Sequence, residues 1–76
     1  MLKSSQKIED IHKQLGEYRN YFSSLHDRRQ ESYDKKSDTW KEGEKGDEES
    51  WNLSLLEETA ENLEDAIIRL EELYEI

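Results

Sequence analysis

The sequence comprises 76 residues, of which 32% are hydrophobic and 41% charged, and it carries a formal net charge of −9. A chain of this length forms at most one small domain, and the absence of cysteine excludes disulfides and cysteine metal sites. No stretch approaches the roughly 20 apolar residues of a membrane span. The first residues also lack the apolar run of a secretory signal. We therefore expect a cytoplasmic protein that does not bind membranes.

The charge is divided unevenly along the chain. Residues 1–36 hold eight Lys and Arg against six acids, whereas residues 37–76 hold three against fourteen. Direct contact with nucleic acid or anionic lipid depends on Lys and Arg, so this excess of acid argues against both. It favours a protein partner with a basic surface. The alternative interpretation is that the acids simply keep a small helical protein soluble.

The first predicted element is a long helix over residues 4–36, in which Ser4 or Ser5 can cap the first backbone amides. Gly16 lies inside it, and a glycine in mid-helix suggests the close approach of another helix. Arg29 takes a core position near the end, which predicts a wetter seam there. The apolar side chains recur in alternating steps of three and four, at Ile8, Ile11, Leu15, Tyr18, Phe22 and Leu25.

A polar loop is predicted over residues 37–46, where two glycines accompany a single apolar residue, Trp40. A connection this short makes the flanking helices antiparallel neighbours. Trp40 is expected either to cover the end of the bundle or to anchor a partner.

A second long helix is predicted over residues 47–75. Asp47 is its expected N-cap, and Ser54 with Glu57 offers a later capping box. Trp51, in its first turns, has the same two interpretations as Trp40. The apolar ladder of this helix comprises Leu53, Leu56, Ala60, Leu63, Ile67, Leu70 and Tyr74.

Two ladders with alternating three- and four-residue steps indicate helices packed side by side, and no segment has the two-residue period of a strand. The predicted fold is all-α: a coiled-coil-like, antiparallel two-helix hairpin forming one domain over residues 1–76. Leu55, Ala66 and Leu73 lie beside the second ladder and make its apolar stripe wider than one neighbour needs. A homodimer forming a four-helix bundle would supply the second neighbour. Tyr21 has two possible roles, in the dimer seam or in contact with another partner.

An acidic surface on the second helix is the candidate partner-binding site. Helix neighbours three and four residues apart lie about 5–6 Å from each other, close to the distance between successive phosphates of a nucleic-acid strand. Such a surface can imitate nucleic acid, although the alternative is a solvated face partly neutralised by Lys and Arg of the first helix. Its members are Glu57, Glu58, Glu61, Glu64, Asp65, Glu71 and Glu72, with Trp40 and Trp51 as candidate anchors.

Catalytic and metal-binding patterns are sparse. Glu9 and His12 have the Glu-x-x-His spacing of di-metal helical bundles, but such sites need a second motif and two further carboxylates facing inward. His26 has no glutamate three residues before it. We interpret both histidines as surface residues. We also find no nucleophile setting and no phosphate loop. We expect no catalytic residue, no metal, no cofactor and no enzymatic activity; a metal-dependent bundle enzyme is the remote alternative.

The segments Trp40-Lys-Glu-Gly-Glu-Lys-Gly46 and Leu56-Glu-Glu-Thr-Ala-Glu-Asn-Leu-Glu-Asp-Ala-Ile-Ile-Arg-Leu-Glu-Glu-Leu73 resemble small acidic helical-hairpin proteins of bacteriophages and plasmids. The match covers the second half well and the first half only by helix type, and the proline and asparagine expected before the loop are missing. The resemblance implies a mobile genetic element as habitat, hence the cytoplasm of a host cell, and implies no activity.

Together these patterns lead us to expect a non-catalytic, acidic protein-binding module. Its sharpest form is a phage or mobile-element inhibitor that occupies the basic, nucleic-acid-binding surface of a host defence enzyme by mimicking DNA or RNA. The alternative is a structural or assembly adaptor that acts by helix packing alone.

Overall fold

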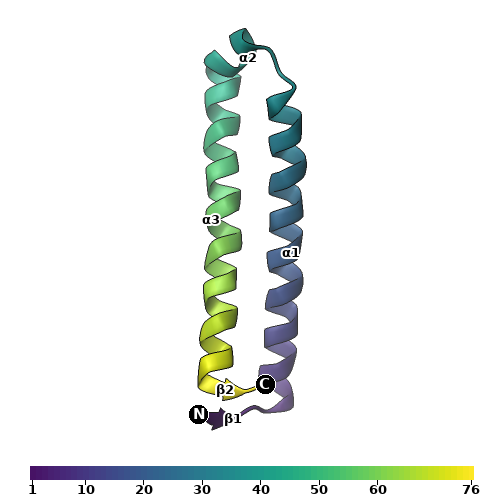
Figure 1. Cartoon of the computed structure of the whole chain (residues 1–76), viewed down its shortest axis with the longest axis vertical. Coiled ribbons are helices and arrows are strands. Elements are labelled where there is room, and N and C mark those ends of the chain that lie inside the picture. The colour runs from purple at the N-terminus through teal and green to yellow at the C-terminus, as the bar shows by residue number, and fades with distance from the viewer.

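The computed structural model describes all residues, 1–76, and consists mainly of two long antiparallel helices (Figure 1). Helix α1 spans Gln6–Asp34 and helix α3 spans Glu44–Leu73, and the two pack along their length. The short helix α2, Asp38–Glu42, crosses the end where they are joined. The molecule is a rod of 55 × 15 × 13 Å. The predicted all-α hairpin is confirmed.

Helix α1 begins directly after Ser5, whose hydroxyl caps it. Ser5 has an extended backbone, and its Oγ accepts a hydrogen bond from the amide of Ile8 at 3.3 Å. This bond satisfies one of the amides that the first helical turn leaves without a partner. Of the two serines that the sequence offered as caps, Ser5 therefore takes the role.

The predicted loop is largely helical. Ser37 accepts a hydrogen bond from the amide of Trp40 at 3.2 Å and thereby caps α2. Gly43, with an extended backbone, ends α2 and is also the N-cap of α3, without a side-chain bond. The expected cap at Asp47 is therefore wrong: Asp47 lies in the first turn of α3, where an acid interacts favourably with the positive helix end. The later capping box at residues 54–57 lies inside the continuous helix.

The close approach predicted at Gly16 occurs instead at Gly46. A Cβ atom added to Gly16 meets nothing within 4 Å, whereas one added to Gly46 would lie 2.2 Å from the carbonyl oxygen of Lys41. Gly46 is buried, and its lack of a side chain lets the backbone of α2 lie directly on the first turn of α3. This contact sets the position of α2 at the end of the rod.

The apolar seam between α1 and α3 is thin. Leu53 and Ile67 are buried, with 5% and 4% of their surface exposed, and the other ladder residues of both helices are half-buried, with one exception. Tyr18 is 54% exposed, so it is not part of the core of the single hairpin, whereas a role in a dimer seam stays a prediction. Its neighbour Arg19 is half-buried instead. A strict three-four ladder drifts around a straight helix, because 3.5 and 3.6 residues per turn differ, and this drift carries Tyr18 to the edge of the seam.

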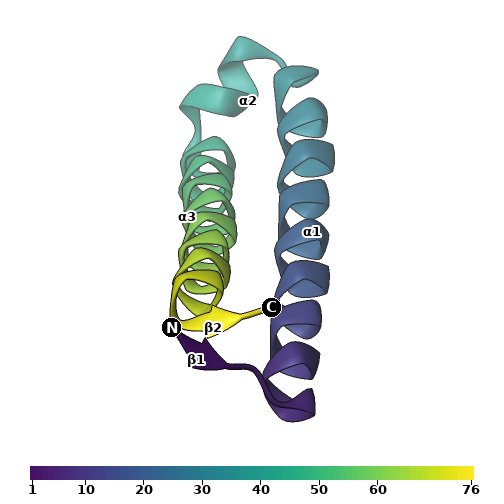
Figure 2. The ribbon, with the colours of Figure 1, turned by 60° about the horizontal axis from the view of Figure 1, so that its bottom comes forward.

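The two ends of the chain pair with each other, which the sequence did not predict. Strand β1, Leu2–Lys3, runs parallel to strand β2, Tyr74–Glu75, with Leu2 opposite Tyr74 (Figure 2). The expectation that the chain has no strand is wrong at this point. A two-residue strand is too short to show a periodic pattern, and its pairing depends on the hairpin bringing both ends together. None of the helices has the length and hydrophobicity that crossing a membrane requires.

Candidate interaction surface

Three polar contacts cross the seam between α1 and α3. His12 Nε2 lies 2.9 Å from Glu71 Oε1, and Arg19 forms an ion pair with Glu64. Towards the α2 end, Arg29 donates to the carboxylate of Glu49, with the shorter contact at 2.6 Å. The wetter seam expected at Arg29 is therefore present as an ion pair.

The exposure of the two histidine side chains changes their interpretation. Only 26% of the His12 side chain and 20% of the His26 side chain is exposed. His26 Nδ1 lies 3.2 Å from the carboxylate of its neighbour Asp27. Their assignment as surface residues is therefore wrong, because both fall at the margin of the seam, where the facing helix covers them.

The predicted acidic surface separates into two groups. Glu64 and Glu71 already have partners on α1, Arg19 and His12 respectively. The others are exposed and have no ion pair within the chain, and we call them the unpaired acidic strip: Glu57, Glu58, Glu61, Asp65 and Glu72.

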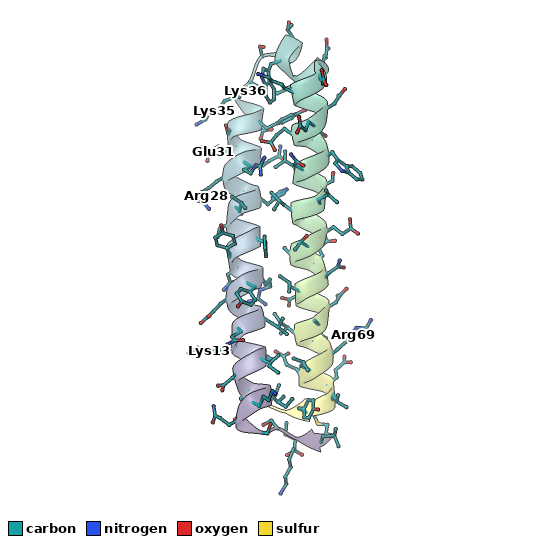
Figure 3. The ribbon with its side chains drawn as sticks, turned by 180° about the vertical axis from the view of Figure 1, so that it is seen from behind. Lys13, Arg28, Glu31, Lys35, Lys36 and Arg69 are labelled. Atoms are coloured by element: carbon teal, nitrogen blue, oxygen red, sulfur yellow. The ribbon has the colours of Figure 1, made fainter.

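The unpaired acidic strip begins beside the seam, where Glu57 and Glu61 face a groove shared with α1, and continues along the exposed surface of α3. Arg69 is the only cation on this half of α3, and it projects from the outer edge of the helix (Figure 3). It forms no ion pair, although Asp65 and Glu72 are four and three residues away along the helix. On the opposite edge of the rod, the labelled charged side chains of α1 point outward: Lys13, Arg28, Glu31, Lys35 and Lys36. The chain therefore leaves these acids to solvent or to a partner.

An open groove lies between α1 and α3 beside the acidic strip. No group of three or more His, Asp or Glu side chains in the chain is placed to hold a metal ion. Glu9 and His12, with the spacing of di-metal bundles, do not converge on a common site either, because His12 is turned towards Glu71. The groove is lined by Ser23, His26, Asp27, Glu57, Ala60 and Glu61.

The two tryptophans have different environments. Trp40 is half-buried on α2, where its ring packs edge-on against Tyr33 with centroids 6.1 Å apart and the Lys36 ammonium lies 5.2 Å from its ring centroid. It therefore covers the end of the seam. Trp51 is 65% exposed on α3 and makes no aromatic or cation–π contact. Of the two candidate anchors, only Trp51 is mostly exposed to solvent.

The sequence interpretation missed His12, Arg19 and Gly46 as structural residues. A signal existed for the first two, because each lies next to a ladder position and its partner, Glu71 or Glu64, lies at the matching level of the antiparallel helix. Gly46 gave no such signal, since its role depends on where α2 lies. No protein-family model, curated protein or solved structure matches this chain.

Proposed function

We propose that this protein is a non-catalytic binding module whose unpaired acidic strip occupies the basic, nucleic-acid-binding surface of a protein partner. The observation that carries the proposal is that five exposed acids on α3 have no ion pair within the chain. Glu57, Glu61 and Asp65 follow one another at four-residue intervals, a spacing at which like charges destabilise a helix. The fold does not require this repulsion, whereas a cationic partner would relieve it.

The density of charge supports nucleic-acid mimicry over a merely soluble face. The strip extends from Glu57 to Glu72, about 22 Å along the helix axis at 1.5 Å per residue. Its five acids therefore present one charge per about 4.5 Å, compared with one phosphate per 3.4 Å of axis on a DNA strand. A surface that binds phosphates along a strand would meet a similar row of negative charge.

In its most specific form, the proposal is an inhibitor encoded by a phage or another mobile element, acting on a host defence enzyme in the bacterial cytoplasm. Its support is the resemblance of residues 40–46 and 56–73 to hairpin proteins of such elements, together with the charge of the strip. We further propose that the protein is a homodimer whose two hairpins form a four-helix bundle, since the hairpin alone buries only Leu53 and Ile67 among its apolar residues.

The second candidate function is an assembly adaptor that acts by helix packing alone. It is favoured by the exposed apolar residues of the rod, of which Tyr21 at 58% and Leu55 at 41% are examples. The two functions differ in what binding requires: charge on α3 for the inhibitor, apolar surface for the adaptor.

Competition with DNA tests the inhibitor directly. Purified basic nucleases and nucleoid proteins are bound to fluorescent duplex DNA, and release of the DNA is followed by anisotropy as the protein is added. The variant Glu57→Gln/Glu61→Gln/Asp65→Asn removes three charges, each contributing about 0.5 kcal/mol at an exposed site. The protein concentration needed to release half of the DNA should therefore rise about tenfold. Release should also fall steeply as salt rises, because exposed charges are screened.

A matched control distinguishes the effect of the strip's own charges from the effect of the protein's net charge. Glu9, Glu17 and Glu42 are exposed and have no ion pair, and replacing all three with Gln gives the same net charge as the strip variant. This control should release DNA as the wild type does. Equal loss in both variants would mean that only overall charge matters. If the wild type still releases DNA at high salt, and the strip variant releases it as well as the wild type does, the adaptor would be favoured.

A further inference from the structure

The rod has two broad faces with different chemistry. On one face the cross-seam pairs His12–Glu71 and Arg19–Glu64 lie between the helices, beside the open groove. The opposite face of the rod is formed by the side chains that lie on the other side of the seam on each helix, as the rotation of 100° per residue places them. We call it the uncharged face. The residues along its centre are Gln14, Tyr18, Tyr21, Leu25 and Ser32 of α1 and Asn52, Leu55, Thr59, Asn62 and Ala66 of α3.

The uncharged face is unusual in a chain with this composition. Charged residues make up 41% of the sequence, yet none occupies the centre of this face between Gln14 and Leu25 or between Leu55 and Ala66. Towards α2 the face is charged, because Asn52 shares a pocket with Arg29, Lys45, Glu48 and Glu49. Tyr18 and Tyr21 are both more than half exposed on it. The hydroxyl of Thr59 already donates to the carbonyl of Leu55 at 2.7 Å, so burying Thr59 leaves its own hydroxyl donor paired.

We infer that a second copy of this chain covers the uncharged face. The inference rests on the homodimer proposed above and specifies where the copies meet. A basic partner would find no carboxylate at the centre of this face, whereas a second copy brings an uncharged face of the same length and keeps the unpaired acidic strips of both copies away from the interface. Between Gln14 and Leu25, and between Leu55 and Ala66, no charged group then loses its hydration on association; the Arg29–Glu49 pair lies beyond this stretch, towards α2.

Stacking over the full length of the rod would bury the area of a standard interface. The rod is 55 Å long and 15 Å wide, so hairpins stacked in this way would cover about 800 Å² on each copy, which is the area that each partner contributes to such an interface. The charge-free centre takes up about a third of that length at 1.5 Å per residue, and charged residues lie beyond it towards α2. The apolar burial within one hairpin is small, since only Leu53 and Ile67 are buried. The second copy completes a core that one hairpin only half encloses.

Charge selects the arrangement of the two copies. Helix α3 carries eleven acids against two cations, whereas α1 carries six acids against five cations. A two-fold axis parallel to the rod places α1 of each copy on α3 of the other and leaves the two α3 helices diagonal. The alternative axis, across the rod, would make the two strongly acidic helices adjacent, which costs like-charge repulsion.

The shapes of the side chains agree with this arrangement. In the antiparallel hairpin Arg19 is level with Glu64 and His12 with Glu71, so Tyr18 lies near the level of Ala66. When α1 of one copy lies on α3 of the other, the large ring of Tyr18 therefore meets the small Ala66. Large residues facing small ones is the pattern by which helix layers interdigitate.

Light scattering at micromolar concentration provides the first test, with two variants matched in exposure. Leu55 on the uncharged face is 41% exposed, and Ile68 on the flank of α3 that carries the acids is 42% exposed. The wild type and Ile68→Glu should have twice the chain mass of 9.1 kDa, whereas Leu55→Glu should have the mass of one chain. A monomeric wild type would overturn the inference. A monomeric Ile68→Glu variant together with a dimeric Leu55→Glu variant would overturn it as well.

Disulfide cross-linking provides a second test that does not depend on a folded Leu55→Glu monomer. The native chain has no cysteine, so single cysteines can be placed freely. Mixing Tyr18→Cys with Ala66→Cys under mild oxidation should give a covalent heterodimer, whereas Tyr21→Cys alone should not link to itself. The reverse outcome would overturn the arrangement. Neither test involves a basic partner, so a failed DNA competition leaves both results interpretable.

Discussion

The glycine against which α2 packs should respond to alanine in the opposite direction from the glycine in the middle of α1. A Cβ atom at position 46 would lie 2.2 Å from the carbonyl oxygen of Lys41 and 2.5 Å from its carbonyl carbon, both backbone atoms that cannot rotate away. Gly46→Ala must therefore push α2 off α3, and over-packing of this kind typically costs about 1–3 kcal/mol. The displacement also loosens the packing of Trp40 against Tyr33.

Gly16→Ala is the matched control, because its added Cβ meets nothing within 4 Å. Alanine in mid-helix is favoured over glycine by about 1 kcal/mol, so this variant should be more stable than the wild type. For a domain of this size, 1 kcal/mol corresponds to a change in Tm of about 4–8 °C. Thermal unfolding by circular dichroism, at one protein concentration because a dimer's Tm depends on it, should give a higher Tm for Gly16→Ala and a lower one for Gly46→Ala. A Gly46→Ala variant at least as stable as the wild type would refute the reasoning.

Two further substitutions test the core and the first helix cap. Ile67→Ala should lower the free energy of unfolding by about 2–4 kcal/mol in urea, because Ile67 is 4% exposed, whereas Ile68→Ala, at 42% exposed, should change it by less than about 0.5 kcal/mol. Equal effects at these adjacent positions would contradict the orientation of α3. Ser5→Ala should cost about 1 kcal/mol through loss of the bond to the Ile8 amide, and a similar loss on Ser4→Ala would show that the cap is misassigned.

The periodic parts of the chain were predictable and the local contacts were not. Leu53 and Ile67 stand in a ladder whose spacing alone indicates a packed helix face, and both are buried. Helix α2 was concealed by its polar composition, although Ser37, three residues before Trp40, is a recognisable cap. Gly46 could not be identified because its requirement arises only when α2 folds back over α3.

For the candidate site, composition indicated which residues are acidic, whereas only the structure distinguished those that are already paired. Glu64 and Glu61 are equivalent in a list of helix acids, yet Glu64 is level with Arg19 across the seam and Glu61 is not. The register of two helices decides this difference. The sequence pattern did not reveal the geometry of the connection at α2, which joins the two helices.

The pairing of β1 with β2 determines where an attached group would emerge. Leu2 lies opposite Tyr74 and Lys3 opposite Glu75, so residues 1 and 76 are at the same end of the rod (Figure 2). A fluorescent label or fused domain at either position lies far from α2, at the other end of a 55 Å molecule. With the two-fold axis parallel to the rod, all four chain ends of a dimer gather at one end. Two fused reporters would therefore lie close enough for energy transfer between them, while the acidic strips along the rod stay uncovered.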